Sequence, residues 1–303
     1  MPDKKLILRQ VLDGLMGRYR ERVPDVAAIL DTMVHEGLIR NAAEIENDHI
    51  AFRSLGVPHL GIASLEKIFL HLGYVRRDPY TFSAKRLNAF WYAPPEPQLP
   101  RVFLSELRVA DLPERSRVIV GKYTVSIQRD PVDALDLDDA VAIDRFLHSG
   151  NWPVPTYADY RSLAADSEYA SWAIYNRYYL NHFTISVHNL PAGYNTVADF
   201  NRFLEAHGFV LNDSGGKIKA SPDGGLLQSS TVARMVMAEF AGGQRAEIPG
   251  SYVEFAERRV LPQFAQLPAS AIRREHRREG FEAGNADKIF ESTFVSQTGR
   301  RPD

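Results

Sequence analysis

The segment His49-Ile50-Ala51-Phe52-Arg53-Ser54-Leu55-Gly56 decides the fold prediction, because its side chains alternate in character. In a β-strand, successive side chains point to opposite faces of the sheet. One face of this strand therefore presents His49, Ala51 and Arg53, whereas the other presents the apolar Ile50 and Phe52. Helices can cover the apolar face of such a strand, and its polar face can border a hollow.

Two later segments repeat this alternation. In residues 182–187, one face carries His182, Thr184 and Ser186, and the other is apolar. In residues 252–258, Tyr252 and Glu254 share a face with Ala256 and Arg258, opposite Val253 and Phe255. Each of the three strands combines an apolar face with a face that holds one potential metal ligand. We expect these polar faces to converge in one hollow.

The element order around these strands repeats once along the chain. In residues 46–109, the first strand is followed by a helix over 64–72 and by strands over 74–82, 87–92 and 101–107. In residues 180–260, a strand over 181–187 is followed by a helix over 196–207 and by strands over 209–211, 226–232 and 251–258. Both stretches have the order β-α-β-β-β, although their sequences are not similar.

The remaining segments are predicted to be helical and peripheral. Residues 1–45 contain two helices, over 5–19 and 24–37, and residues 110–179 form a mostly helical insertion that includes an acidic, solvated stretch. Residues 261–303 form a C-terminal segment in which 272–291 looks like a solvated helix. The sequence thus predicts a single catalytic domain over 1–303. Its α+β fold has two β-α-β-β-β modules that form a curved mixed sheet around a metal site, with helices outside.

The composition restricts the chemistry. Apolar residues make up 45% and charged residues 24% of the chain, as in average soluble globular proteins. The formal net charge of −2 gives no electrostatic reason to expect nucleic acid or an anionic membrane as a partner. No apolar run approaches the roughly 18–20 residues that span a bilayer, and the N-terminus does not resemble a signal peptide. We therefore expect a cytoplasmic enzyme.

The absence of cysteine narrows the possible metal sites. Disulfides, thiolate zinc sites, iron–sulfur clusters and cysteine nucleophiles are excluded, so a metal must be held by imidazole and carboxylate groups. His49, His182 and Glu254 supply two imidazoles and one carboxylate, which is the ligand set of non-haem Fe(II) oxygenases. Arg53 shares the face of His49 and is placed to bind a second carboxylate at the far end of a substrate.

Simpler interpretations of the same residues stay open at this point. The three ligand candidates are too far apart in sequence to form a local motif, and a lone histidine in a strand is more often structural than a ligand. His188 follows His182 by six positions, but Pro191 suggests that the strand has ended by then. Glu257 points to the face opposite Glu254 and is expected to form a salt bridge.

At these residues the chain resembles the 2-oxoadipate dioxygenase/decarboxylases. The similar segments are HIAFRSLGVPHLGIASLEKIFLHLGY (49–74), LNHFTISV (180–187), GGLLQSSTVA (224–233), SYVEFAERRVLP (251–262) and GFEAGNADKIFEST (280–293). They are spread over residues 1–294, and the H-x-A-F-R segment is the most specific. The resemblance implies a vicinal-oxygen-chelate-like fold, which agrees with the element order found above.

The resemblance also implies roles for individual residues. His49, His182 and Glu254 match the metal ligands of the family, and Arg53 matches the arginine that binds the substrate carboxylate. Gln228 and Ser230 match a segment that lines the substrate pocket, and Ser186, on the face of His182, is a further candidate contact. Residues 185–190, ISVHNL, depart from the longer bacterial members, and this departure concerns substrate identity more than the metal.

The implied reaction is the oxidation of 2-oxoadipate by O₂ to 2-hydroxyglutarate and CO₂, a step of lysine catabolism. The implied cofactor is Fe(II), which Zn, Ni or Mn can replace during purification. Two alternatives use the same fold and ligands: a zinc or manganese lyase or isomerase, and a metal-dependent protein that binds a small carboxylate without catalysis. The sequence predicts no oligomeric state.

Overall fold

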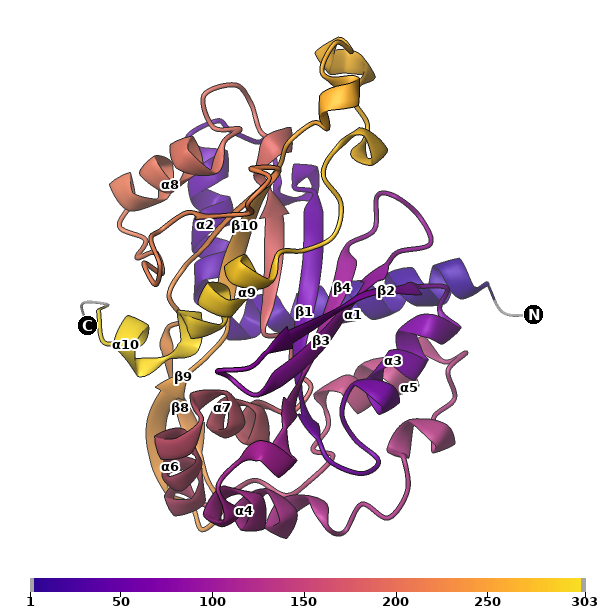
Figure 1. Cartoon of the computed structure of the whole chain (residues 1–303), viewed down its shortest axis with the longest axis vertical. Coiled ribbons are helices and arrows are strands. Elements are labelled where there is room, and N and C mark those ends of the chain that lie inside the picture. The colour runs from indigo at the N-terminus through magenta and orange to yellow at the C-terminus, as the bar shows by residue number, and fades with distance from the viewer. Residues whose placement is uncertain (1–2, 301–303) are drawn as a thin grey trace.

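A curved eight-stranded mixed sheet forms the centre of the computed structural model, which describes residues 3–300 (Figure 1). Its strands lie side by side in the order β2-β3-β4-β1-β5-β10-β7-β6. Their bounds are Asn47–Gly56 (β1), Val75–Phe82 (β2), Leu87–Ala93 (β3), Arg101–Arg108 (β4), His182–Ser186 (β5), Lys219–Ala220 (β6), Leu226–Ser230 (β7) and Tyr252–Arg258 (β10). A separate hairpin contains β8 (Met235–Glu239) and β9 (Arg245–Pro249).

The sheet consists of two halves with the same topology. In the first half, β1 is followed by α3 (Ile62–His71) and by β2, β3 and β4, and β1 pairs with β4 in parallel. In the second half, β5 is followed by α8 (Val197–Ala206) and by β6, β7 and β10, and β5 pairs with β10 in parallel. The halves join through antiparallel pairing of β1 with β5. The predicted α+β fold with two β-α-β-β-β modules is therefore confirmed.

The strand registers relate the two halves position by position. Two residues after His49, Ala51 lies opposite Phe103 of β4. Two residues after His182, Thr184 lies opposite Glu254 of β10. Directly paired residues point to the same face of a sheet, so Phe103 in the first half corresponds to Glu254 in the second.

Helices lie around the sheet, as predicted. α3 packs on β4, α7 on β1, and α8 on β7 and β10. In the described residues the helices besides α3 and α8 are α1 (Lys4–Arg22), α2 (Pro24–His35), α4 (Glu114–Thr124), α5 (Ala140–His148), α6 (Tyr157–Asp166), α7 (Glu168–Asn176), α9 (Ala283–Ile289) and α10 (Val295–Thr298), together with short 3₁₀ turns. None of these helices has the length and apolar character needed to cross a bilayer.

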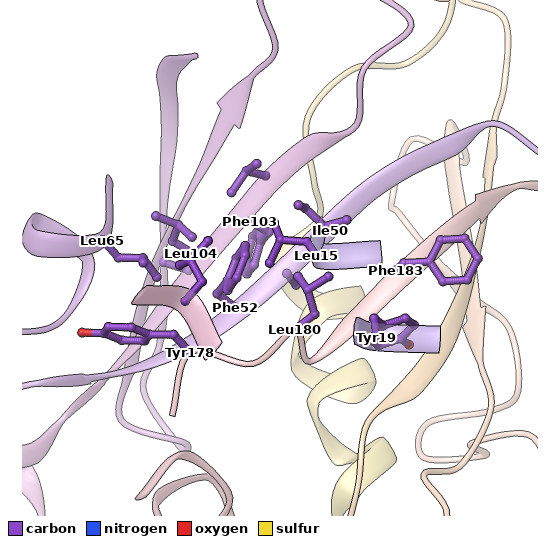
Figure 2. Close-up of a cluster of buried hydrophobic side chains, with 14 of the residues drawn as sticks. Leu15, Tyr19, Ile50, Phe52, Leu65, Phe103, Leu104, Tyr178, Leu180 and Phe183 are labelled. Carbon is purple, nitrogen blue, oxygen red and sulfur yellow. The ribbon is translucent and has the colours of Figure 1, made fainter. Parts of the chain in front are cut away.

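The apolar faces of the three central strands form the main core. Ile50 and Phe52 of β1 and Phe183 of β5 are buried in one cluster with Leu15 and Tyr19 of α1 (Figure 2). Full burial of one such side chain contributes about 1.5–3 kcal/mol. This core fixes the register of the strands, because a shift by one residue would turn the apolar faces toward the hollow and the polar faces toward the helices.

Three segments differ from the sequence prediction. The second strand of module two is β6, whereas the predicted strand over 209–211 makes only an isolated bridge between Leu211 and Thr231. The hairpin of β8 and β9 was not predicted. Residues 272–291 do not form one solvated helix: they contain a 3₁₀ turn at Arg274–His276 and the short helix α9.

The C-terminal segment instead covers the inner face of the sheet. Helix α9 contacts β2 in one half and β6 and β7 in the other, so it bridges the two modules (Figure 1). Phe281, Ile289 and Phe290 in this segment are buried. These three apolar side chains hold the segment down, because their burial removes them from water. Four arginines of the predicted solvated helix lie outside any α-helix, and their side chains bind backbone carbonyls: Arg273, Arg274, Arg277 and Arg278.

Candidate metal centre and substrate cavity

Three neighbouring strands bring the predicted ligands together. His49 lies on β1, His182 on β5 and Glu254 on β10, and all three side chains are buried. The two histidine Nε2 atoms are 3.3 Å apart, and the Glu254 carboxylate oxygens lie 3.4 Å from Nε2 of His49 and 3.0 Å from Nε2 of His182. One candidate ligand atom from each residue falls within 4.8 Å of the others. Such a group could hold a metal ion.

The other ring nitrogen of each histidine has its own partner. Nδ1 of His49 lies 2.8 Å from Oδ1 of Asp48, and Nδ1 of His182 lies 3.1 Å from Oδ1 of Asn181. An acceptor at Nδ1 favours the tautomer with its proton there, which leaves the Nε2 lone pair for a metal. Two lone pairs and a carboxylate then face one another, and the Thr184 hydroxyl lies 3.0 Å from Nε2 of His49. A divalent cation fits this donor set.

The charge states of the three candidate ligands also favour a divalent cation. Burial lowers the pKa of His182 to about 3, so this ring is neutral. Burial opposes charge on His49 as well, but Glu254 and Asp48 raise its pKa above the usual value. The two carboxylates thus attract positive charge to His49, which either a proton or a metal cation can supply. Despite its burial, the pKa of Glu254 is lowered by the two histidines.

Asp48 belongs to a buried ionic network. Its carboxylate accepts hydrogen bonds from Nε of Arg258 at 2.6 Å and from Nη1 of Arg101 at 3.1 Å. Burial opposes the charge of Asp48, but these guanidinium groups hold its pKa well below the usual range. The pairing of β1 with β5 is irregular between Asn47 and Ile50. Such a bulge re-aims side chains, and here it accompanies the contact of Asp48 with the ring of the next residue.

A second polar chain supports Glu254. Gln228 of β7 donates from Nε2 to Glu254 Oε1 at 2.6 Å, and its own Oε1 accepts from Asn285 of α9 at 3.0 Å. Lys219 of β6 lies opposite Gln228 in the sheet, is buried, and donates to the carbonyl of Asn212 at 2.7 Å. Burial lowers the pKa of Lys219 to about 8, although Glu254 opposes the shift.

Arg53 lies on the face of His49 and is only 1% exposed. Its Nη1 donates to Oγ1 of Thr293 and its Nη2 to the carbonyl of Phe290, both at 2.9 Å. Among the described residues, no carboxylate lies within ion-pair distance of Arg53, and its Nε has no hydrogen-bond partner. The guanidinium also lies about 5.0 Å from the ring centres of Tyr169 and Trp172. Arg53 is therefore a buried cation without a carboxylate partner.

The ligands line a small cavity of about 20 Å³, and Arg53 is not among its lining residues. Its other walls are mainly apolar and come from both modules and from the C-terminal segment: Phe103, Gln228, Tyr252, Phe281, Ala286, Ile289 and Phe290. Roughly 10–15 Å³ suffices for one water molecule, so a six-carbon acid requires side chains or the covering segment to shift. The ring of Phe281 lies 4.8 Å from that of His49.

The structure places the other predicted substrate residues differently. Gln228 lines the cavity. Ser230 lies opposite Glu254 and shares a hydrogen bond of 2.8 Å with Ser292. Ser186 donates to Glu46 at 3.2 Å and does not line the cavity. The geometry gives Ser186 no support as a substrate contact, and the roles of all three residues remain predictions.

Two further candidates have structural roles. His188 lies within 3.3 Å of the Ala256 carbonyl and accepts from the Arg258 amide, away from the ligand group. Glu257 forms an ion pair with Arg259, as expected, and accepts from the amide of Val197.

Sequence reasoning did not identify Asp48 and Asn181 as partners of the candidate ligands. A signal was available, because each candidate histidine directly follows an Asp or Asn. Asx side chains are short hydrogen-bond acceptors, and ligating histidines commonly have such a partner at their other nitrogen. Arg101 and Arg258 gave no comparable signal, because each is distant in sequence from Asp48.

Fold and site together define a class: an α+β protein with two β-α-β-β-β modules and, between them, a His-His-Glu group that could hold a metal ion. A glyoxalase superfamily protein from Ralstonia eutropha has this fold, with a TM-score of 0.72 at 22% identity over 93% of this chain and 88% of that one. A sequence profile described as 2-oxoadipate dioxygenase/decarboxylase matches residues 11–271. The chain belongs to this family.

Individual relatives agree with this assignment. A chloroplastic 2-oxoadipate dioxygenase/decarboxylase of Arabidopsis thaliana is 42% identical over 97% of this chain and 79% of its own length. The crystal structure of hydroxyglutarate synthase from Oryza sativa in complex with 2-oxoadipate has a TM-score of 0.90 and 41% identity, covering 99% of this chain and 96% of that one. The resemblance seen in the sequence motifs is confirmed, whereas the cytoplasmic location stays a prediction.

Proposed function

We propose that this chain holds Fe(II) on His49, His182 and Glu254 and converts 2-oxoadipate and O₂ into 2-hydroxyglutarate and CO₂. The names of the Arabidopsis and rice relatives support the substrate and the reaction class. The observation that carries the proposal is the buried guanidinium of Arg53, without a carboxylate partner among the described residues, on the same strand face as His49. A dicarboxylic 2-oxo acid supplies one carboxylate for the metal and one for this cation.

In the proposed reaction the protein's own side chains bind and orient the metal and the substrate. Iron on two imidazoles and one carboxylate supplies oxygen activation and leaves three positions open to ligands. Asp48 and Asn181 hold the two imidazoles with Nε2 toward the centre. Gln228 holds the carboxylate of Glu254 through a hydrogen bond of 2.6 Å. These contacts fix the ligands before substrate arrives, so binding energy is not spent on ordering them.

Arg53 would set the position of the far carboxylate. Its fork is already oriented by Thr293 and Phe290, while Nε remains available. A planar guanidinium binds carboxylate in a bidentate manner that an ammonium cannot reproduce. The ring centre of Phe290, which also lines the cavity of the ligands, lies 5.7 Å from this guanidinium. Exclusion of water by such apolar side chains strengthens charge pairing. The distance along the sheet between metal ligands and Arg53 then selects the length of the 2-oxo acid.

The test is anaerobic reconstitution with Fe(II), followed by oxygen uptake and product analysis with a series of 2-oxo acids. We expect one CO₂ and one 2-hydroxyglutarate for each O₂ consumed with 2-oxoadipate. Turnover without oxygen uptake, supported by zinc or manganese, would indicate a lyase or isomerase. Tight binding of 2-oxoadipate without turnover under any of these metals would indicate a carboxylate-binding protein. Either result would overturn the proposal, including its assignment to lysine breakdown.

A further inference from the structure

We infer that Phe103 keeps one corner of the metal centre free of a protein ligand and thereby leaves room for a chelating substrate and O₂ together. Because this inference requires a metal at His49, His182 and Glu254, it rests on the proposed function. Its basis is the internal symmetry of the sheet. Phe103 stands in the first module where Glu254 stands in the second.

The correspondence extends to the neighbouring strand. Glu254 lies opposite Ser230 of β7, and Phe103 lies opposite Trp91 of β3. His49 and His182 are the matching residues of the two opening strands, so a symmetrical centre would have two histidines and two carboxylates. Phe103 is 4% exposed and lines the same cavity as the three ligands. The side chain at position 103 thus borders the metal centre, but it has no donor atom.

The side chains around Glu254 are polar, whereas those around Phe103 are aromatic. The carboxylate of Glu254 receives a hydrogen bond from Gln228, which a charged ligand requires in a buried place. Around Phe103 the neighbours are aromatic: its ring centre lies 4.9 Å from that of Phe281, which in turn lies 6.1 Å from that of Trp91. The indole N–H of Trp91 is bound to Asp78 at 2.9 Å. The first module therefore presents an apolar corner and the second a polar one.

This asymmetry has a consequence for coordination. Three protein ligands on a six-coordinate ion leave three positions, enough for a chelating 2-oxo acid and for O₂. A fourth protein ligand would leave two, and the substrate and oxygen could not then bind together. The side chain at position 103 therefore decides whether the centre has three open positions or two.

The experiment compares Phe103→Glu with Phe103→Leu, using Co(II) as a spectroscopic substitute. Competition with a chelator gives the Co(II) affinity, and visible absorption reports the effect of adding 2-oxoadipate. We expect Phe103→Glu to bind Co(II) at least about tenfold more tightly than the wild-type protein. Phe103→Leu should keep the wild-type affinity within about threefold and keep the response. A folded Phe103→Glu protein with unchanged or weaker Co(II) affinity would overturn the inference.

If circular dichroism shows that Phe103→Glu does not fold, the inference is tested on the wild-type protein instead. Pulsed electron paramagnetic resonance of bound Mn(II) in D₂O counts exchangeable waters. We expect three waters on the bound ion without 2-oxoadipate and one with it, and a centre that keeps no water beside bound 2-oxoadipate would contradict an open corner. Failure of the proposed function gives a different result, because the wild-type protein would then bind no Co(II) at the triad or show no oxygen uptake with Fe(II).

Discussion

Replacing Arg53 by methionine removes a buried guanidinium and keeps an unbranched side chain in its place. The structure predicts two separate effects. The Thr293 hydroxyl and the Phe290 carbonyl lose their donor, and an unsatisfied buried polar group costs about 1–3 kcal/mol of folding free energy. The second effect concerns only substrates with a second carboxylate, because no other partner for that group lies on this strand face.

The magnitude of the second effect follows from burial. Truncating one partner of a buried, hydrogen-bonded charge pair costs about 2–5 kcal/mol. Arg53 is 1% exposed, so water screens the pair little, and the upper part of this range, about 3–5 kcal/mol, applies. At 1.4 kcal/mol for each factor of ten, kcat/KM for 2-oxoadipate should fall by about 100-fold to about 4000-fold.

The assay compares 2-oxoadipate with 2-oxohexanoate, which has the same chain length but one carboxylate. Oxygen uptake gives kcat/KM for both acids with the wild-type protein and with Arg53→Met, at equal iron content. The loss with 2-oxohexanoate should stay below about tenfold, because this acid never used the guanidinium. Equal losses with both acids would refute the reasoning and would assign Arg53 a structural role only.

Three further predictions follow from the centre. Asp48→Asn should weaken metal binding by about 10- to 100-fold in chelator competition, and more than Asn181→Ala, because Asp48 alone contributes a charge. Removing the metal should lower the melting temperature, since the ligands lie on β1, β5 and β10 and join the two modules; metal at 100 times its Kd should restore about 2.7 kcal/mol. The pKa of Lys219 is about 8 in the folded protein against 10.5 in the unfolded chain. Between these two values the unfolded chain binds a proton that the folded protein does not, so Lys219 destabilises the fold, most strongly below pH 8. Lys219→Met should therefore gain most stability over the wild type in urea unfolding at pH 7, and this gain should shrink toward pH 10.5.

The first module could be predicted well from the sequence, and the second less well. β1 to β4 each have seven residues or more, which is long enough to recognise them as strands, and short loops separate β2, β3 and β4. β6 has only two residues, Lys219 and Ala220, which are too few to show the alternation of a strand. Its position is set by pairing with Gln228, a long-range contact that local propensity does not report. The missed hairpin does contain Gly242-Gly243, a pair typical of tight turns.

The candidate ligands could be predicted because successive side chains of a strand alternate between its two faces, so the residues that share a face can be identified from the sequence. The C-terminal segment could not be placed in the same way, since its four arginines suggest a solvated helix. Their side chains bind backbone carbonyls in irregular structure, and the burial of Phe281 and Phe290 against the site depends on the complete sheet. The network of Asp48, Arg101 and Arg258 likewise joins residues that are distant in the chain.

The contact of Arg53 with Thr293 joins residues that are 240 positions apart. Closing so long a loop costs chain entropy, and this cost is met only when both segments are present. During synthesis, β1 leaves the ribosome long before the segment that orients its arginine. The carboxylate clamp is therefore absent until residues 290–293 have been made and have docked. Incomplete chains are expected to lack oriented Arg53, and activity appears only with the fully assembled domain.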